Sequence, residues 1–378
     1  MVRVTRSRTT ALLVAAALLL PATPASALDV PCAPGSPIED CDFTPEPSPG
    51  FGWVTGDVPD SPVGEWYTPW ALRQANYTDS VARTNRVRHD GPGAYTVYVD
   101  RVTGGGGVAH VSALGTGNRG RCKLVTTYPA GSGQYLVVRC DNLAGTPKDS
   151  AFTASFTNLR TTAHEFGYRS GVGGAVWAHN SESGAVTTAH EGTGAYRVTF
   201  DGLGGEPGGT VQVTATGQST SWCKVADWYP DEQVSARHVL VRCFTPAGQP
   251  VDSEFTTTFV ETGSLMGDQV PRPGLRSAYA RVMPDLTVPA PWTSPRLPAH
   301  PFSAQGMKGA AGYLEVVTPL NVVDPLGEGY AHVTATGPDP VSCGTGGWGG
   351  NWIYARCFTP AGVTVNAPFT VAYLGAFV

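Results

Sequence analysis

Apolar and polar side chains alternate with a period of two along much of this chain. In the stretch Thr210–Gly217, TVQVTATG, Val211 and Val213 lie on one side of an extended strand and Gln212 and Thr214 on the other. This period, together with enrichment in Val, Thr, Tyr and Phe, predicts β-strands, and the Gly and Pro clusters between the runs predict turns. We expect antiparallel sheets with one face buried and the other face in water.

The strand pattern occurs three times along the sequence, and we take each occurrence as one domain. Each copy has an alternating run that ends in Gly, then two cysteines separated by a turn-rich stretch, then an aromatic–Thr strand. These closing strands are Ala151–Phe156, Glu254–Val260 and Pro368–Leu374. About six or seven short strands in roughly 100 residues favour a β-sandwich over a small barrel. We therefore predict an all-β protein of three tandem, disulfide-stapled antiparallel β-sandwiches, immunoglobulin-like or of a similar Greek-key order.

The repeats and the N-terminal composition divide the chain into five segments. These are a signal peptide at 1–27, a Pro-rich tail at 28–50 and three β-sandwich repeats at 51–160, 161–262 and 263–378. The first segment combines Arg3, Arg6 and Arg8 with the apolar run Ala11–Leu20 and an A-x-A site before Leu28. This is the pattern of a secretory signal, so we expect an extracellular protein.

The net charge of the chain disfavours polyanionic partners. The formal net charge at pH 7 is −5, and loss of the signal, which holds three arginines and no acidic residue, makes it −8. A negative chain is poorly suited to nucleic acid or to an anionic membrane surface. We expect neither as a partner, and we predict no membrane span, because the apolar run of the signal is too short to cross a bilayer.

The eight cysteines of an exported chain are predicted to form four disulfides. The segment from Cys122 to Cys140 has its midpoint in the turn-forming sequence PAGSG. A hairpin about that point places the two cysteines opposite each other, within disulfide reach. The same symmetry predicts the pairs Cys223–Cys243 and Cys343–Cys357, and leaves Cys32–Cys41 to staple the N-terminal tail.

One heptapeptide occurs twice: Arg242–Gly248 and Arg356–Gly362 both read RCFTPAG. It is either a repeated binding or catalytic loop or a repeated structural corner. The first copy reads DNLAG over Asp141–Gly145, which keeps the Gly and loses the Pro. A turn tolerates this variation better than a catalytic loop does, so we predict the exit turn of a cysteine-bearing strand.

Candidate catalytic residues are few. The His–acid dipeptides at 89–90 and 190–191 occupy matching positions before a Gly-Ala-Tyr strand, and the third copy lacks them. His110 and His332 match each other and Gln212, which favours a polar residue on a wetted face. No G-x-S-x-G elbow, phosphate-binding loop or zinc-protease motif occurs, and paired cysteines leave no thiolate for a metal. We assign no catalytic residue, no metal site and no cofactor.

Aromatic residues concentrate in the longest insertions of the repeats, Gly50–Asn85 and Pro271–Lys308. The candidate binding residues there are Trp53, Trp66, Tyr67, Trp70 and Trp292. Exposed Trp and Tyr can stack on sugar rings or anchor a protein partner. The competing interpretation is that these side chains cap the sandwich cores.

The pattern GAYxVxF…GGTVQVTATG…CKV…VRCFTPAG…VDSEFTTTFV resembles repeat units of secreted actinobacterial proteins of unknown function, most closely over Gly194–Val260. The resemblance implies an extracellular all-β repeat and brings no activity with it. The leading hypothesis is a secreted non-catalytic repeat protein that binds an extracellular surface, glycan or protein partner. A secreted hydrolase with carboxylates in a cleft is the alternative, and a protease inhibitor that presents a rigid loop such as Trp348–Asn351 is a further one.

Overall fold

A computed structural model describes residues 50–70, 73–77, 85–102, 104, 106–115, 117–160, 164–205, 208–266, 275–293, 302–306, 312–318, 323 and 329–376. The predicted signal peptide and the predicted pair Cys32–Cys41 lie outside these residues. The described part is all β and belongs to one compact unit, Asp42–Val378. Nowhere in the described ranges is there a helix whose length and hydropathy would suit a membrane span.

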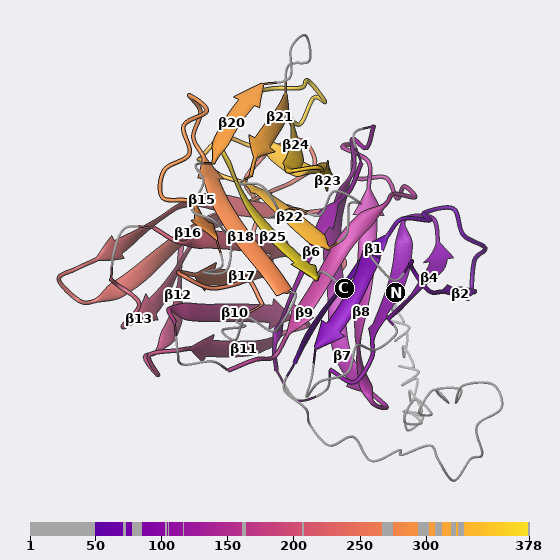
Figure 1. The fold of residues 1–378 in the computed structure, drawn as a ribbon, viewed down its shortest axis with the longest axis horizontal. Helices are drawn as coiled ribbons and strands as arrows, with labels where there is room; N and C mark the ends of the chain where they lie inside the picture. The colour runs from indigo at the N-terminus through magenta and orange to yellow at the C-terminus, as the bar shows by residue number, and fades with distance from the viewer. Residues whose placement is uncertain are drawn as a thin grey trace, which may run out of the picture. The chain divides into compact units, whose positions relative to one another are not determined.

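The described strands build six antiparallel sheets, two for each sequence repeat (Figure 1). The first sandwich contains β1 (Phe51–Gly56), β2 (Trp66–Tyr67), β3 (Gln74–Tyr77), β4 (Arg86–Gly91), β5 (Ala94–Val99), β6 (Val108–Ala113), β7 (Arg121–Ala130), β8 (Gly133–Asp141) and β9 (Phe152–Thr157). The second contains β10 (Phe166–Val172), β11 (Ala175–Asn180), β12 (Val186–Gly192), β13 (Ala195–Asp201), β14 (Thr210–Ala215), β15 (Trp222–Asp231), β16 (Ala236–Phe244) and β17 (Phe255–Val260). The third contains β18 (Leu275–Val282), β19 (Trp292–Thr293), β20 (Ser303–Gly306), β21 (Tyr313–Val317), β22 (Tyr330–Ala335), β23 (Ser342–Gly349), β24 (Trp352–Phe358) and β25 (Phe369–Ala376).

The three sandwiches share one strand order, as three copies of one domain should. Their sheets are β3-β1-β9-β6 with β2-β4-β5-β8-β7, then β11-β10-β17-β14 with β12-β13-β16-β15, then β19-β18-β25-β22 with β20-β21-β24-β23. In each sandwich the first strand pairs with the last: β1 with β9, β10 with β17 and β18 with β25. The ABED order of a constant-type immunoglobulin sheet lacks this pairing.

Each cysteine hairpin closes as the sequence predicts. Disulfides join Cys122 to Cys140, Cys223 to Cys243 and Cys343 to Cys357, each with Cα atoms 4.0 Å apart on directly opposed strand positions. Two or three residues after the first cysteine, each hairpin carries a β-bulge, which increases local twist and leaves one residue unpaired.

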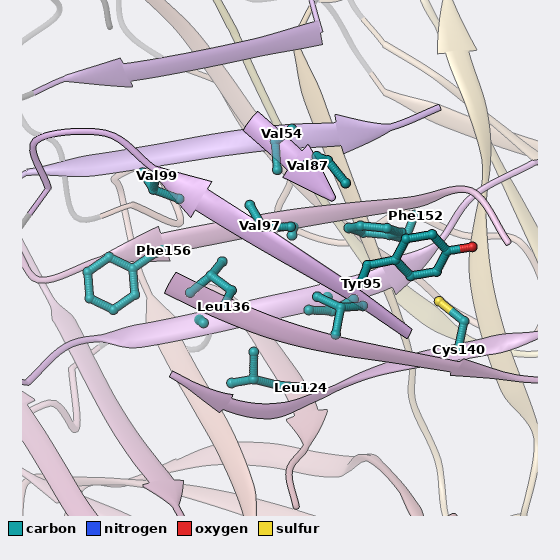
Figure 2. Close-up of a cluster of buried hydrophobic side chains, with 14 of the residues drawn as sticks. Val54, Val87, Tyr95, Val97, Val99, Leu124, Leu136, Cys140, Phe152 and Phe156 are labelled. Atoms are coloured by element: carbon teal, nitrogen blue, oxygen red, sulfur yellow. The ribbon is translucent and has the colours of Figure 1, made fainter. Parts of the chain in front are cut away.

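The core of each sandwich comes from the inward side of the alternating strands. Figure 2 shows this for the first sandwich, where Tyr95, Leu136 and Phe152 converge with Cys140 between the two sheets. All four residues are buried. Cys140 and its counterparts Cys243 and Cys357 are all buried and belong to the cores of their sandwiches.

The three sandwiches contact one another head to tail and close into a ring. The backbone N–H of Gly217 in the second sandwich donates to Val125 O of the first at 3.1 Å. The equivalent Gly337 of the third donates to Ala226 of the second at 3.0 Å, and Gly115 of the first donates to Thr345 of the third at 2.9 Å. Each acceptor lies at or beside the β-bulge. The same type of heterologous interface thus joins the first sandwich to the second, the second to the third and the third to the first, and a head-to-tail interface that closes in this way forms a cyclic ring.

The repeated heptapeptide lies where the three domains meet. A Cβ placed on Gly248 would approach Pro360 Cγ of the next RCFTPAG turn to 2.5 Å, and one on Gly145 would approach Pro246 Cγ to 2.8 Å. Both glycines have positive φ, which an L side chain tolerates poorly. The circle closes through Gly362, whose Cβ would lie 3.4 Å from Leu143 Cδ1. These turns are the predicted structural corners, and they are also contacts between domains. We call them the axial turns.

One expectation from the alternation is wrong. The polar sides of β6, β14 and β22 were expected in water, yet His110, Gln212 and His332 are all buried. The reason is that these faces form the ring interface. His110 Nε2 lies 2.8 Å from Thr258 Oγ1 of the second sandwich, and Tyr330 OH of the third lies 3.0 Å from Ser155 Oγ of the first. The ring interface is thus a polar interface between copies.

Candidate binding face on the first sandwich

The five aromatic residues singled out by the sequence do not gather at one place. Trp53 is fully buried, and it belongs to a core cluster shared between the first and third sandwiches. Trp292 packs against the same cluster and stacks on Tyr279, with ring centroids 5.5 Å apart. For these two residues the structure supports the competing interpretation, a role in packing.

The other three lie in the first sandwich at different depths. Tyr67 packs against the sandwich core, and desolvation by burial is the main cause that raises the pKa of its hydroxyl. Trp66, its neighbour on β2, points to the opposite side of the strand and is half-buried. Trp70 follows β2 and is 60% exposed.

Trp66 lies beside a row of tyrosines on the outer face of the sheet β2-β4-β5-β8-β7. The residues Arg86, Tyr98, Tyr135 and Tyr128 are directly opposed across four neighbouring strands. Tyr128 and Tyr135 are parallel, with ring centroids 5.2 Å apart, and Tyr98 lies 5.0 Å from Tyr135. Cross-strand aromatic pairs of this kind stabilise a sheet. Tyr98 and Tyr135 are themselves buried, with 3% and 8% of their surface exposed, so the surface that this row offers to a ligand is mainly that of Tyr128, which is 36% exposed.

Two arginines complete the outer layer. Arg86 lies over the rings of Trp66 and Tyr98, at 5.6 and 5.2 Å from their centroids, and Arg88 lies 4.9 Å from the centroid of Trp66. Arg88 also pairs with Asp90. Arg86 has no ion pair among the described residues, so its guanidinium donors remain available to a ligand. We define the binding face by the residues Trp66, Arg86, Arg88, Tyr98, Tyr128 and Tyr135.

The other two sandwiches lack this arrangement at the equivalent positions. The row in the second sandwich is Thr199, His238 and Tyr229. In the third sandwich it is Val317, Trp352 and Gly349. The aromatic–arginine row is therefore a property of one copy rather than of the shared fold. Sequence reasoning identified Trp66 but missed the tyrosines, although the period of two in AYTVYV and the aligned hairpin GQYLVV would have placed Tyr98 and Tyr135 on one face.

The histidines that precede the Gly-Ala-Tyr strands pair with distant acids, not with their sequence neighbours. His89 Nε2 lies 3.1 Å from Asp149 Oδ1, which also accepts from the backbone N–H of Gly93 at 2.6 Å. In the second sandwich, His190 and Gly194 share Asp252 in the same way, at 2.9 and 2.7 Å. Hydrogen bonding to the Gly194 N–H is the largest cause that lowers the pKa of Asp252. These carboxylates tie a loop to the start of a strand, which is a structural task.

The third sandwich performs the same task without a histidine. There the N–H of Gly312 donates to the side chain of Asn366 at 2.9 Å. An amide can replace the carboxylate because the hydrogen bond to the backbone is what the strand requires. This substitution favours a structural role for the His–Asp pairs over general acid–base chemistry.

The alternative functions can be compared with two places in the described structure. A glycosidase needs two carboxylates that face each other across a cleft. The cavity between the three sandwiches is lined by one carboxylate, Asp141, which Arg139 binds at 2.9 Å. The proposed inhibitor loop begins at Trp348, which packs on the third core and lies under Arg73, 5.5 Å from its ring centroid. Groups of His, Cys, Asp or Glu that could hold a metal ion are absent from the part of the chain described here.

Comparisons with models of protein families, with curated proteins and with solved structures return no match to this chain. The class that fold and site together define is an all-β, disulfide-bonded protein of three antiparallel sandwiches. The resemblance to actinobacterial repeat units stays a prediction.

Proposed function

We propose that this chain is a secreted, non-catalytic repeat protein that binds an extracellular glycan through the binding face of its first sandwich. The observation that carries the proposal is the accessible pair Trp66 and Tyr128, which the buried rings of Tyr98 and Tyr135 support and two arginines flank, in one copy only. A flat aromatic surface stacks on the apolar face of a sugar ring, and guanidinium groups donate to hydroxyl or carboxylate oxygens. The disulfides agree with an extracellular location.

The second sandwich supplies a matched control for the test. Tyr128 is 36% exposed and Tyr229, its equivalent, is 39% exposed, but Tyr229 has a histidine where Tyr128 has the parallel ring of Tyr135. Replacing either tyrosine by alanine removes the same side chain from an equivalent strand position. Folding should be affected to a similar extent in the two variants.

The test is binding of the full secreted chain to a glycan array and to insoluble polysaccharides, followed by affinity measurement on the best ligand. We expect Tyr128→Ala and Trp66→Ala to weaken binding at least tenfold, because stacking residues at the centre of an interface carry much of its free energy. Tyr229→Ala should leave the affinity within about twofold. A wild-type protein that binds no glycan, or equal losses in the two tyrosine variants, would refute the proposal.

A further inference from the structure

A cavity of about 80 Å³ lies where the three sandwiches meet, beside the axial turns. Its walls come from equivalent segments of all three copies, the ends of β6, β14 and β22 and the starts of β7, β15 and β23. One water molecule needs roughly 10–15 Å³ of such space. The cavity therefore has room for several water molecules or for one small polyatomic ion.

The charged side chains that line this cavity are mostly cationic. They are Arg121, Lys123, Lys224 and Arg356, against the single acid Asp141. Lys123, Lys224 and Arg356 are only 5%, 2% and 7% exposed, and Asp141 is occupied by Arg139. Four basic side chains in one cavity are unusual in a chain with a net charge of −5 and four lysines in all. Desolvation lowers the pKa of Lys123 to about 8 and that of Lys224 to about 7, and a bound anion would favour their protonated forms.

The hydrogen-bond partners of Arg121, Lys123 and Lys224 within the protein are neutral. Lys123 Nζ donates to the backbone carbonyls of Ser219 and Ser221, at 2.8 and 3.1 Å, and Lys224 Nζ donates to the carbonyl of Asp339 at 2.9 Å. Arg121 Nε donates to Ser342 Oγ at 3.1 Å. Carbonyl and hydroxyl oxygens orient a cation but carry no charge to balance it.

Arg121 gives the clearest sign of a missing partner. Its guanidinium lies 4.5 Å from the ring centroid of Trp222, and its Nη2 is buried without a hydrogen-bond partner. A buried nitrogen of a charged group without an acceptor is costly. Desolvation lowers the pKa of Arg121 only to about 10, so the group stays charged at neutral pH.

We propose that the cavity between the three sandwiches is a binding site for one small inorganic oxyanion, of the phosphate or sulfate class. Such an ion brings the negative charge that the cationic walls lack and offers an acceptor to Arg121 Nη2. Arginine and lysine are the side chains that bind oxyanions in proteins. Because all three copies contribute to the walls, the ion would join the domains as a structural ligand, independently of the glycan face.

The first measurement asks whether the protein holds an anion. The full secreted chain is dialysed exhaustively against buffer with chloride as the only inorganic anion and then denatured, and the released ions are identified by ion chromatography. In parallel, isothermal titration with inorganic phosphate and with sulfate is performed at constant ionic strength. We expect either one oxyanion released per chain or binding of one added phosphate or sulfate per chain. Absence of both results overturns the proposal.

The second measurement locates the site. Arg121→Gln should reduce the occupancy or the affinity at least tenfold, and Lys224→Gln should do the same from the opposite wall. Arg197→Gln is the matched control, because it removes one cation at an exposed ion pair with Glu191, away from the cavity. A loss in the control as large as in Arg121→Gln would assign the binding to net charge and refute the cavity site. Circular dichroism of each variant shows whether it is folded, and Lys224→Gln serves if Arg121→Gln is not.

Discussion

Replacing Gly248 by alanine tests the closed ring of domains at its tightest contact. Gly248 has a φ of +81°, and a new Cβ would meet Pro360 Cγ of the next sandwich at 2.5 Å and Pro340 Cβ at 3.2 Å. Two costs add. An alanine in the left-handed region costs about 1–2 kcal/mol, and forcing a methyl group against rigid proline rings costs about 1–3 kcal/mol more.

Gly217 separates these two costs. It lies in the same sandwich with nearly the same φ, +83°, but a Cβ there has no atom within 4 Å. Gly217→Ala should therefore show the backbone cost alone, and it keeps the N–H that donates to Val125.

The assay is thermal unfolding of both variants by calorimetry, with disulfides intact. We expect the Tm of Gly248→Ala to lie a few degrees below that of Gly217→Ala, since about 1 kcal/mol shifts the Tm of a large domain by roughly 2–4 °C. If the two variants have the same Tm, the axial turns do not touch as described, and the ring must be open at this contact.

Three further predictions follow from buried polar groups. Arg237 is fully buried and pairs with Glu261 at 3.1 Å, so Arg237→Ala should lower the free energy of unfolding by about 3–5 kcal/mol in urea titrations, and the double variant Arg237→Met with Glu261→Leu should recover much of it. Desolvation lowers the pKa of Lys224 to about 7, and the charge of Asp339 acts in the opposite direction. Between about pH 7 and pH 10 the unfolded chain therefore holds more protons than the folded chain, so the free energy of unfolding in oxyanion-free buffer should increase as the pH rises through this range. Lys224→Met should flatten that increase. His110→Gln should cost at most about 1 kcal/mol in the same titrations, because glutamine holds the equivalent place in the second sandwich, whereas His110→Leu should cost about 1–3 kcal/mol by leaving Thr258 without its partner.

The strands, the three copies and the three described disulfides could be predicted from sequence because each depends on local information. The period of two fixes the faces of a strand, and the symmetry of Cys122 and Cys140 about a turn fixes their register. What covers the polar face of a sheet, water or another domain, does not depend on local sequence alone. Alternation in TVQVTA shows that Gln212 and Thr214 share a side, but it does not show whether water or another domain covers that side.

A second signal in the sequence could have revealed the ring interface. The strands that form it, β6, β9, β14, β17, β22 and β25, contain no Asp, Glu, Lys or Arg. A sheet face in water normally carries some charged side chains, because these residues are the ones least often buried. β4 and β12, on the outer sheets, do carry them, in RVRHDG and VTTAHEG. Polar but uncharged faces in every copy indicate contact between copies.

The same contrast explains why function is sought on the outer sheets. The hydrogen bonds donated by Gly115, Gly217 and Gly337 repeat in every copy, so a change in one of these faces would have to fit a neighbour that is itself a copy. Thr153, Thr256 and Thr370 illustrate this, since each hydroxyl forms a hydrogen bond with the domain beside it. The outer sheets contact a neighbouring domain through β7, β15 and β23, and the positions away from these contacts are freer to differ. That freedom is what allows one copy to carry an aromatic–arginine face while the second carries Thr, His and Tyr and the third carries Val, Trp and Gly in its place. It makes the first sandwich the part of the ring in which recognition of a ligand could arise without loss of the assembly.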